Sequence, residues 1–246
     1  IVFYGSIYKD KEFTMFKPDD NNFEQSHFAA VLALTKENLE KYRKEEKALS
    51  DELYTLLETY GAKDVEALSM IDNLQVMYER ARHEASRAER ARQKPFFGRI
   101  DFVDDKHKSN DTIYIGKVGI SRDVTHLEVI DWRAPVANSY YESHIGEVTY
   151  SVPREGDFVI DLKKKRTYEI KDDTLLSFFD SDVVANDELL NRYLSQNKKA
   201  VLGEIIATIQ KEQNDIIRQS PYKSIIVQGA AGSGKTTVAM HRISYI

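Results

Sequence analysis

The last stretch of the chain, residues 224–246, constrains the fold more than any other. It reads SIIVQGAAGSGKTTVAMHRISYI, so a short apolar run (Ile225 to Val227) leads directly into a glycine-rich turn and then into residues with helical spacing. The turn, Gly229 to Thr236, matches G-x-x-x-x-G-K-[ST], a pattern that needs a strand before it and a helix after it. We therefore expect strand, loop and helix here, as the start of a P-loop α/β (RecA-like) domain.

Each residue type in this loop suits the binding of phosphate groups. Glycines let the backbone adopt conformations closed to residues with a Cβ, so that successive N–H groups point into one concavity. The helix that begins near Lys235 adds the positive end of its dipole, and the lysine adds a mobile charge. The Thr236 hydroxyl can ligate Mg²⁺. The sequence thus predicts a site for ATP and Mg²⁺, with Lys235 and Thr236 as catalytic residues. The nucleotide-binding residues are Gly229, Ala230, Ala231, Gly232, Ser233, Gly234, Lys235, Thr236 and Thr237.

Composition excludes several other classes of protein. The 246 residues carry a net charge of only −5, so bulk charge does not indicate a nucleic-acid partner. The absence of cysteine rules out a disulfide framework and a thiolate metal site, and it leads us to expect a reducing, cytoplasmic location. No run approaches the roughly 18 apolar residues of a membrane span. Because the chain starts at Ile1 and stops within an apolar helical pattern, we expect it to be a fragment of a longer protein.

Two long helical patterns follow an irregular lead-in over residues 1–26. Apolar residues alternate steps of three and four from His27 to about Tyr60, which indicates a long helix with a helical partner. Gly61 interrupts this pattern, and a second begins at Lys63. Its seam residues are Ala67, Met70, Leu74, Met77, Ala81, Ala88 and Ala91, with Glu84 interrupting. Two long seams joined by a short break predict an antiparallel helical hairpin.

Charge divides along this predicted hairpin. Residues 45–66 carry seven acids against two lysines, whereas residues 80–94 carry six bases against two acids. The end near Gly61 is therefore acidic and the opposite end is basic. Such charges are typical of a solvated coiled coil, but they also fit an arm whose acidic tip enters a basic cavity of a partner.

After Pro95 the period changes from helical to two. We predict short strands over residues 96–102, 112–120, 127–132 and 147–152, and a hairpin over 157–170 with Lys163 to Lys165 at its turn. These form a small antiparallel β module. Within it Asp131, Trp132 and Arg133 are consecutive, which we interpret as a buried Trp corner with an Asp–Arg pair. We reject Asp131 as a Mg²⁺ ligand, because that acid should come from a later strand of the parallel sheet.

Helical spacing returns over residues 186–219 and stops before Pro221. Within it, IQKEQNDIIR (Ile209 to Arg218) lies about twenty residues before the glycine loop and resembles the glutamine motif of superfamily 1 helicases of the UvrD, PcrA and Rep type. That resemblance implies that Gln213 contacts adenine. One departure is Thr237, which stands where those helicases often carry an arginine, so the chain lacks a guanidinium near the base at this position.

The remaining segments narrow the resemblance. A long helical hairpin followed by FFGRIDF, YIGKVG, VIDWRAPVA and IATIQKEQ is similar to the HelD family, described as DNA helicase IV-like. That resemblance implies a superfamily 1 ATPase that binds bacterial RNA polymerase through a coiled-coil arm and helps to release it from nucleic acid. It also implies that the acid that orients water, the Mg²⁺-holding aspartate and the arginine fingers follow residue 246. We therefore expect this chain alone to hydrolyse ATP negligibly.

Two alternatives remain open. The chain could belong to a UvrD/PcrA-like DNA helicase of repair or replication, or it could be a non-enzymatic interaction module with a vestigial P-loop. In each case we expect an α+β chain with four regions. They are an unassigned lead-in (1–26), an antiparallel coiled-coil arm (27–94), a small antiparallel β module (95–185) and a truncated motor domain (186–246).

Overall fold

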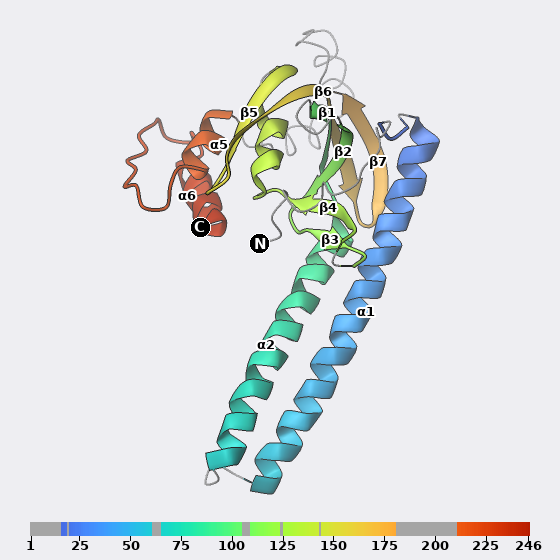
Figure 1. Ribbon diagram of the computed structural model, residues 1–246, viewed down its shortest axis with the longest axis vertical. Coiled ribbons are helices and arrows are strands. Elements are labelled where there is room, and N and C mark those ends of the chain that lie inside the picture. Colours follow the sequence, from blue (N-terminus) through green and yellow to red (C-terminus); the bar gives the residue numbers. More distant parts are fainter. Residues whose placement is uncertain are drawn as a thin grey trace.

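The computed structural model shows two long helices that extend from a curled β-sheet, with two shorter helices on another side of the sheet (Figure 1). It describes residues 16–18, 20–60, 65–104, 109–123, 125–142, 144–180 and 211–246. Most of the helical pattern predicted over 186–219 lies outside the described residues, as do Gly61 and Lys63 between the long helices. No helix in the described part of the chain is long and apolar enough to cross a membrane.

The long helices form the predicted antiparallel arm, but it starts earlier than predicted. Helix α1 spans Asn21–Tyr60 and α2 spans Val65–Gln93. Asp20 caps α1, because its Oδ1 accepts a hydrogen bond from the Phe23 N–H at 2.8 Å. Placing the first turn of the helix in an irregular lead-in was therefore wrong, and this turn carries Glu24, which is fully buried.

The seam of α2 also differs from the predicted one. Met70 and Met77 are 55% and 51% exposed. The helix instead packs through a second heptad pattern that shares four positions with the first. Its residues are Ala67, Ile71, Leu74, Tyr78, Ala81, Ala85 and Ala88. This register keeps Glu84 out of the seam, so the charge that interrupted the predicted pattern is the physical reason for the shift.

The sheet has seven strands in the order β3-β4-β2-β1-β6-β5, with β7 paired to β6. Pairing is antiparallel except between β2 and β4, which run parallel, so the sheet is mixed rather than purely antiparallel. A 3-10 helix, η3, spans Pro135–Tyr141. The strands are β1 (Gly98–Asp104), β2 (Ser109–Gly116), β3 (Ile120–Ser121), β4 (Leu127–Asp131), β5 (Gly146–Val152), β6 (Gly156–Lys171) and β7 (Thr174–Asp180).

The hairpin predicted over 157–170 is wrong, because β6 is one continuous strand of 16 residues. One edge of β6 pairs with β1, while its other edge pairs first with β5 up to Leu162 and then with β7 from Arg166. The three lysines between these positions mark the change of partner. No glycine, proline or asparagine stands among them to allow a tight turn. Strand β7 was not predicted.

The two faces of the sheet bury different neighbours, as the alternation of side chains along a strand requires. On β2, Tyr114 packs with Phe28 and Val31 of the arm. Its neighbour Ile115 packs on the opposite face in a cluster with η3 and with Ile217 and Val238. These last two belong to the shorter helices α5 (Lys211–Ile217) and α6 (Lys235–Tyr245). The sheet therefore separates the arm from the segment that carries the glycine loop.

The strand predicted before the glycine loop does not form. Residues 224–230 have no regular structure, and the Ile226 side chain is 96% exposed. An isolated strand of a parallel sheet lacks neighbours to satisfy its backbone and to cover both faces. The described residues therefore give an α+β fold, without the parallel sheet predicted at this end.

Candidate nucleotide site

The glycine loop has the backbone that its sequence predicts. Gly232 and Gly234 have φ angles of 82° and 81°, which residues with a Cβ rarely adopt. Helix α6 follows at once, and no side chain caps its first N–H groups at Gly234. Free N–H groups and the helix dipole then point toward the loop, an arrangement that favours an anion.

Lys235 reaches back across the loop. Its Nζ donates hydrogen bonds to the carbonyl oxygens of Gly229 (2.8 Å) and Ala230 (2.6 Å). It also lies 3.4 Å from the Ser233 hydroxyl. The ammonium group therefore sits over the concave side of the loop, where it could exchange these carbonyl partners for phosphate oxygens. Because Lys235 is partly exposed, that exchange requires little movement of the backbone.

Gln213 of α5 lies beside the loop. A Cβ placed on Gly234 would be 3.2 Å from the Gln213 side-chain nitrogen, a distance tighter than most real contacts. The structure thus brings together a glutamine and a loop about twenty residues apart in the sequence. Glycine is favoured at residue 234 mainly by its φ of 81°, and a Cβ there would also press on the Gln213 amide.

Thr236 and Thr237 lie exposed in the first turn of α6. The Thr236 hydroxyl could give one oxygen ligand to Mg²⁺, with the nucleotide's own phosphate oxygens and water supplying others. The described residues contain no cluster of three His, Cys, Asp or Glu that could hold a metal. The loop, Lys235 and Gln213 together fit a nucleotide, and Thr236 fits a metal that arrives with it.

Arginine side chains fix the loop segment to the sheet. Arg242 of α6 donates to the carbonyl oxygens at the end of α5, including those of Ile217 (3.0 Å) and Gln219 (2.9 Å). Arg218 donates to the carbonyl oxygens of Trp132 and Ala134, and Arg133 returns a hydrogen bond to the Ser244 carbonyl at 3.2 Å. These contacts hold α5 and α6 against the corner between β4 and η3.

That corner is the predicted buried tryptophan. Trp132 is 8% exposed and packs against Tyr245 at 6.2 Å between ring centroids, with the Arg218 guanidinium 5.9 Å from its ring. Asp131 accepts two hydrogen bonds from the Arg133 guanidinium, at 2.9 and 3.0 Å. The structural interpretation of these three residues is confirmed, and the Asp131 carboxylate pairs with Arg133.

A buried cluster of charged residues at the root of the arm was missed by sequence reasoning. Glu24 accepts hydrogen bonds from Arg99 (2.6 Å), Arg166 (2.7 Å), Tyr114 (3.1 Å) and Tyr168 (2.8 Å). Burial raises the pKa of the Tyr168 hydroxyl, which keeps it protonated as a donor. Arg99 also binds Asp101, and Arg166 binds Asp180. We call these residues the Glu24 cluster, and they join α1 to β1, β2 and β6.

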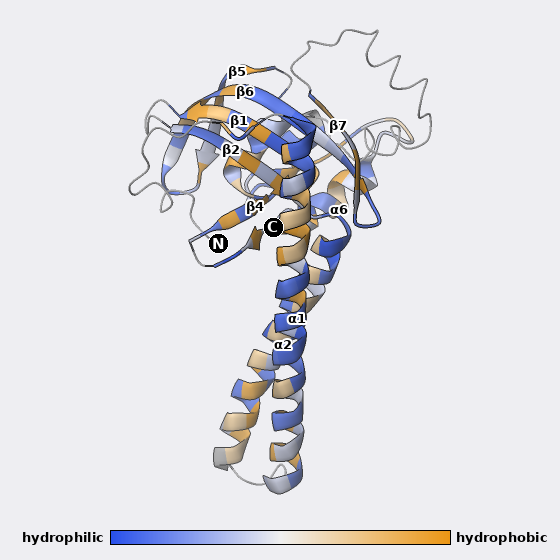
Figure 2. Ribbon diagram, turned by 90° about the vertical axis from the view of Figure 1, so that its right-hand side faces the viewer, coloured by the Kyte–Doolittle hydropathy of each residue, from blue (hydrophilic) through white to orange (hydrophobic). Residues whose placement is uncertain are grey.

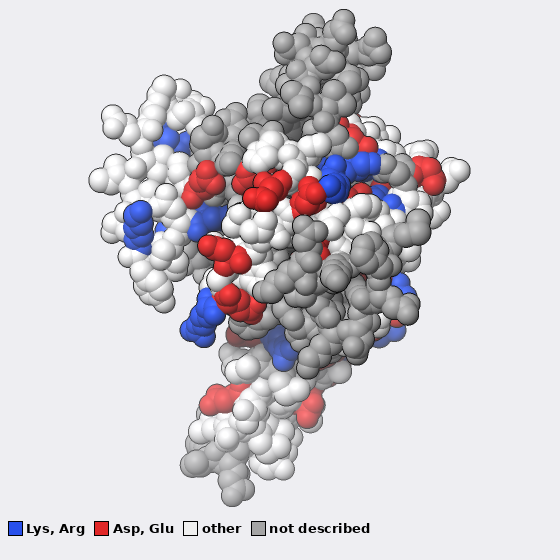
Figure 3. Space-filling model, turned by 45° about the horizontal axis from the view of Figure 1, so that its top comes forward, with Lys and Arg blue, Asp and Glu red and all other residues white. Residues whose placement is uncertain are grey.

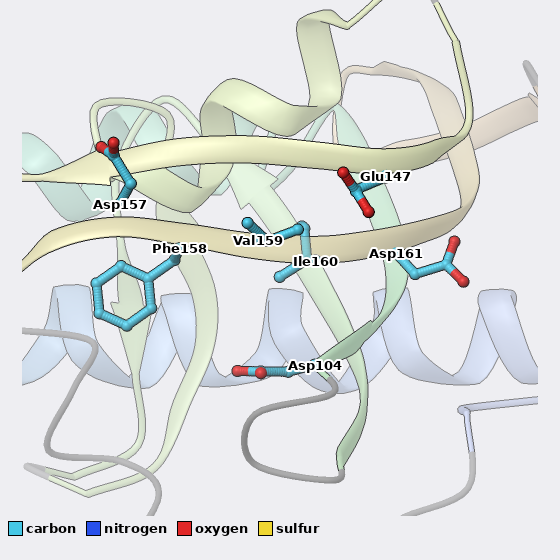
Figure 4. Close-up of a pocket in the computed structure, with 7 residues that line it drawn as sticks. All are labelled: Asp104, Glu147, Asp157, Phe158, Val159, Ile160 and Asp161. Carbon is cyan, nitrogen blue, oxygen red and sulfur yellow. The ribbon is translucent and has the colours of Figure 1, made fainter.

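A pocket of about 470 Å³ lies on β6, away from the glycine loop. It is lined by Asp104, Glu147, Asp157, Phe158, Val159, Ile160 and Asp161, with Asp157 to Asp161 along β6 and Glu147 on the neighbouring β5 (Figure 4). Acidic side chains gather over this part of the sheet (Figure 3). Four carboxylates would repel phosphate, so this pocket does not compete with the loop as a nucleotide site.

Comparison with protein-family models gives a match over the arm and the sheet. The family model described as "DNA helicase IV HelD, N-terminal domain" matches residues 22–197, which is more than half of the chain. The match covers the arm and the sheet and ends before the glycine loop. No curated protein matches the chain.

Proposed function

Because the chain belongs to the family of the DNA helicase IV HelD N-terminal domain, a helicase family, we propose that it binds ATP and Mg²⁺ through residues 229–236 as part of an ATP-dependent motor. The arm formed by α1 and α2 is proposed to bind bacterial RNA polymerase. In the full-length protein the motor would act on DNA and help to release polymerase from nucleic acid.

The proximity of Gln213 to Gly234 carries the nucleotide proposal. A glycine-rich turn alone could be structural. A ligand site is supported by two positive-φ glycines, an uncapped helix start and a glutamine whose side-chain nitrogen would lie 3.2 Å from a Cβ at residue 234. Lys235 and the α6 N–H groups would bind the phosphates, and Gln213 would bind the base. Bound Mg²⁺ would neutralise phosphate charge, and Thr236 would orient it.

Nucleotide titration tests this proposal. A fluorescent ATP analogue with Mg²⁺ should bind the chain, and Lys235→Ala should weaken binding by at least tenfold, because the loop loses its mobile cation at the phosphates. Lys223→Ala is the matched control, since Lys223 is exposed in the same segment. Gln213→Ala should lower the ratio of ATP affinity to GTP affinity, because Gln213 is proposed to bind the base. It should affect the affinity for the triphosphate group less, since that group is proposed to bind Lys235 and the α6 N–H groups. Unchanged binding in Lys235→Ala would favour the interaction module with a vestigial loop.

The polymerase proposal is supported by the surface of the arm far from the sheet. Large apolar side chains are exposed there together with the acids of that end. They are Tyr54 (65%), Leu57 (46%), Tyr60 (55%), Leu68 (40%), Met70 (55%), Val76 (69%) and Met77 (51%). Aromatic and methionine side chains at such density are typical of a protein-binding surface. The acids suit a basic cavity in the partner.

Copurification with core RNA polymerase tests the arm. The chain should retain the polymerase, and Glu52→Lys/Glu58→Lys should weaken retention by reversing two exposed tip charges. Glu37→Lys/Glu40→Lys makes the same change on exposed residues near the sheet and should have little effect. If the chain binds ATP but no polymerase, the alternative role as a DNA helicase of repair or replication, like that of UvrD or PcrA, is favoured.

A further inference from the structure

A row of basic residues lies on α2 near the sheet. Arg80, His83, Arg87 and Arg90 follow the spacing i, i+3, i+7 and i+10, which places them on one face of a helix. We call them the basic stripe. They point away from the seam residues Ala81, Ala85 and Ala88, which are buried against α1. Arg80, His83 and Arg90 are exposed, and the Arg87 side chain is 30% exposed.

Few acids neutralise the basic stripe. Glu84 pairs with Arg87 at 3.3 Å, and Glu89 lies on another face, where it pairs with Arg43 and Arg92. Glu79 lies one turn before His83, at the edge of the stripe, where its carboxylate accepts a hydrogen bond from Gln75 at 3.5 Å. Among the described residues, no carboxylate lies within ion-pairing distance of Arg80 or Arg90. The stripe is therefore a surface of net positive charge within a chain of net charge −5.

The arm carries two surfaces of different chemistry. Hydrophobic residues extend along the end of the arm remote from the sheet (Figure 2), where the exposed apolar side chains reach Met77. Between residues 78 and 144, the described part of the chain exposes no large hydrophobic side chain. Protein interfaces usually need buried aromatic or aliphatic anchors, whereas phosphate-binding surfaces need cations. The stripe therefore suits a polyanion better than a protein.

We propose that the basic stripe binds the sugar-phosphate backbone of a nucleic acid. From Arg80 to Arg90 the helix rises about 15 Å, which spans roughly four nucleotides of one DNA strand at about 3.4 Å each. Arginine suits this role because its planar guanidinium can donate two parallel hydrogen bonds to a phosphate. Binding here needs no base contact, so it is independent of sequence.

DNA binding at different salt concentrations tests the stripe. The chain is titrated with a short fluorescein-labelled DNA duplex, and fluorescence anisotropy reports binding. Arg80→Gln/Arg90→Gln should make the slope of log K against log salt shallower by about 1.8, since each lost phosphate contact contributes about 0.9. At about 0.1 M salt the affinity should fall on the order of 50-fold. Circular dichroism checks that this double variant keeps the helical arm.

Matched variants separate this proposal from charge in general and from the nucleotide site. Lys44→Gln/Lys47→Gln removes the same charge from exposed residues of α1 and should keep the wild-type slope. Lys235→Ala should also keep it, because the stripe lies outside the loop. The proposal is overturned if the duplex does not bind, or if the stripe variant keeps the wild-type slope. Poly-L-glutamate serves as a second probe, which stands for an acidic protein. If the stripe variant loses binding to poly-L-glutamate but keeps its binding to DNA, the proposal is overturned in favour of an acidic protein partner.

Discussion

Glu24 accepts hydrogen bonds from two arginines and two tyrosines while it is fully buried. Burying charges is costly, so such a cluster stabilises a fold only when every member has a partner. Here Asp101 and Asp180 complete the bonding of the two arginines, in bidentate pairs at 2.5 to 2.8 Å. The cluster specifies how α1 meets the sheet, because three strands together offer two cations and two hydroxyls to one carboxylate of α1.

Glu24→Gln should therefore destabilise the protein strongly. The two arginines keep their pairs with Asp101 and Asp180, but the new amide N–H would face arginine and tyrosine groups that all donate. A buried donor left without an acceptor costs about 1–3 kcal/mol. Urea unfolding followed by circular dichroism measures the free energy of unfolding. Glu37→Gln, on an exposed residue of the same helix, should change it by less than about 0.5 kcal/mol. A loss for Glu24→Gln as small as that of the control would show that the cluster contributes little.

His27 predicts a specific dependence of stability on pH. Burial, with Lys17 and Arg99 nearby, lowers its pKa to about 3, and its Nε2 is buried with no hydrogen-bond partner in the described part of the chain. Below about pH 6.5 His27 binds a proton in the unfolded chain, whereas in the folded protein it stays neutral down to about pH 3. The free energy of unfolding therefore falls as the pH drops from about 6.5 toward 3. Between these limits the loss is about 1.4 kcal/mol per pH unit.

The variant His27→Phe isolates this effect. Phenylalanine keeps the ring that stacks on Tyr114 at 4.0 Å between centroids, but it cannot bind a proton. The difference in free energy of unfolding between wild type and variant should change by about 1.4 kcal/mol per pH unit between about pH 6 and pH 4. A difference that stays constant over this range would show that His27 does not titrate as described.

Sequence reasoning found some of these residues and not others, for physical reasons. The loop and Gln213 belong to local patterns of fixed spacing, so their proximity could be predicted, although their role as ligands stays a prediction. Glu24 could not be found in this way, because its partners Arg99 and Arg166 lie far along the chain. The available signal was weak: Glu24 lies one turn before Phe28 on the face of α1 that is buried.

At the scale of elements, the two possible seams of α2 make different predictions. Ile71 is 8% exposed and Met70 is 55% exposed. Ile71→Ala should cost about 2 kcal/mol of local stability, and Met70→Ala should cost little, because only the first removes buried methyl groups. Hydrogen exchange of amides in residues 65–80 should be about 30-fold faster in Ile71→Ala. If Met70→Ala speeds amide exchange more than Ile71→Ala does, the helix packs instead through the predicted seam with Met70 and Met77.

The periodicity of apolar residues predicted most helices and strands. It failed where the extent of a strand depends on which other strands pair with it. The heptad steps predicted both arm helices, and alternation predicted four of the strands near their observed bounds. It could not show that β6 continues through Lys163 to Lys165, since that depends on β1 pairing along one edge while β5 and β7 share the other. The strand expected at Ile225 to Val227 fails for the converse reason, because it has no neighbouring strand among the described residues.

At the scale of the whole molecule, the sheet stands between two attachments. One face holds the arm through the Glu24 cluster, and the other holds α5 and α6 through Trp132, Arg218 and Arg242. Strand β2 contributes to both, because Tyr114 and Ile115 are adjacent residues on opposite faces. Each attachment uses different side chains, so each should be separable by mutation.

Two variants should increase amide exchange in different regions of the protein, residues 211–246 in one and residues 21–35 in the other. Trp132→Ala removes the ring that packs on Tyr245 and lies beside Arg218, so amides of residues 211–246 should exchange at least tenfold faster while those of residues 21–35 stay protected. Glu24→Gln should do the opposite. Hydrogen exchange with mass spectrometry measures both regions in one experiment, and Trp132→Phe, which keeps an aromatic ring, should have a smaller effect. If both variants expose both regions equally, the sheet and its two attachments unfold as one cooperative unit, and independent attachment is wrong.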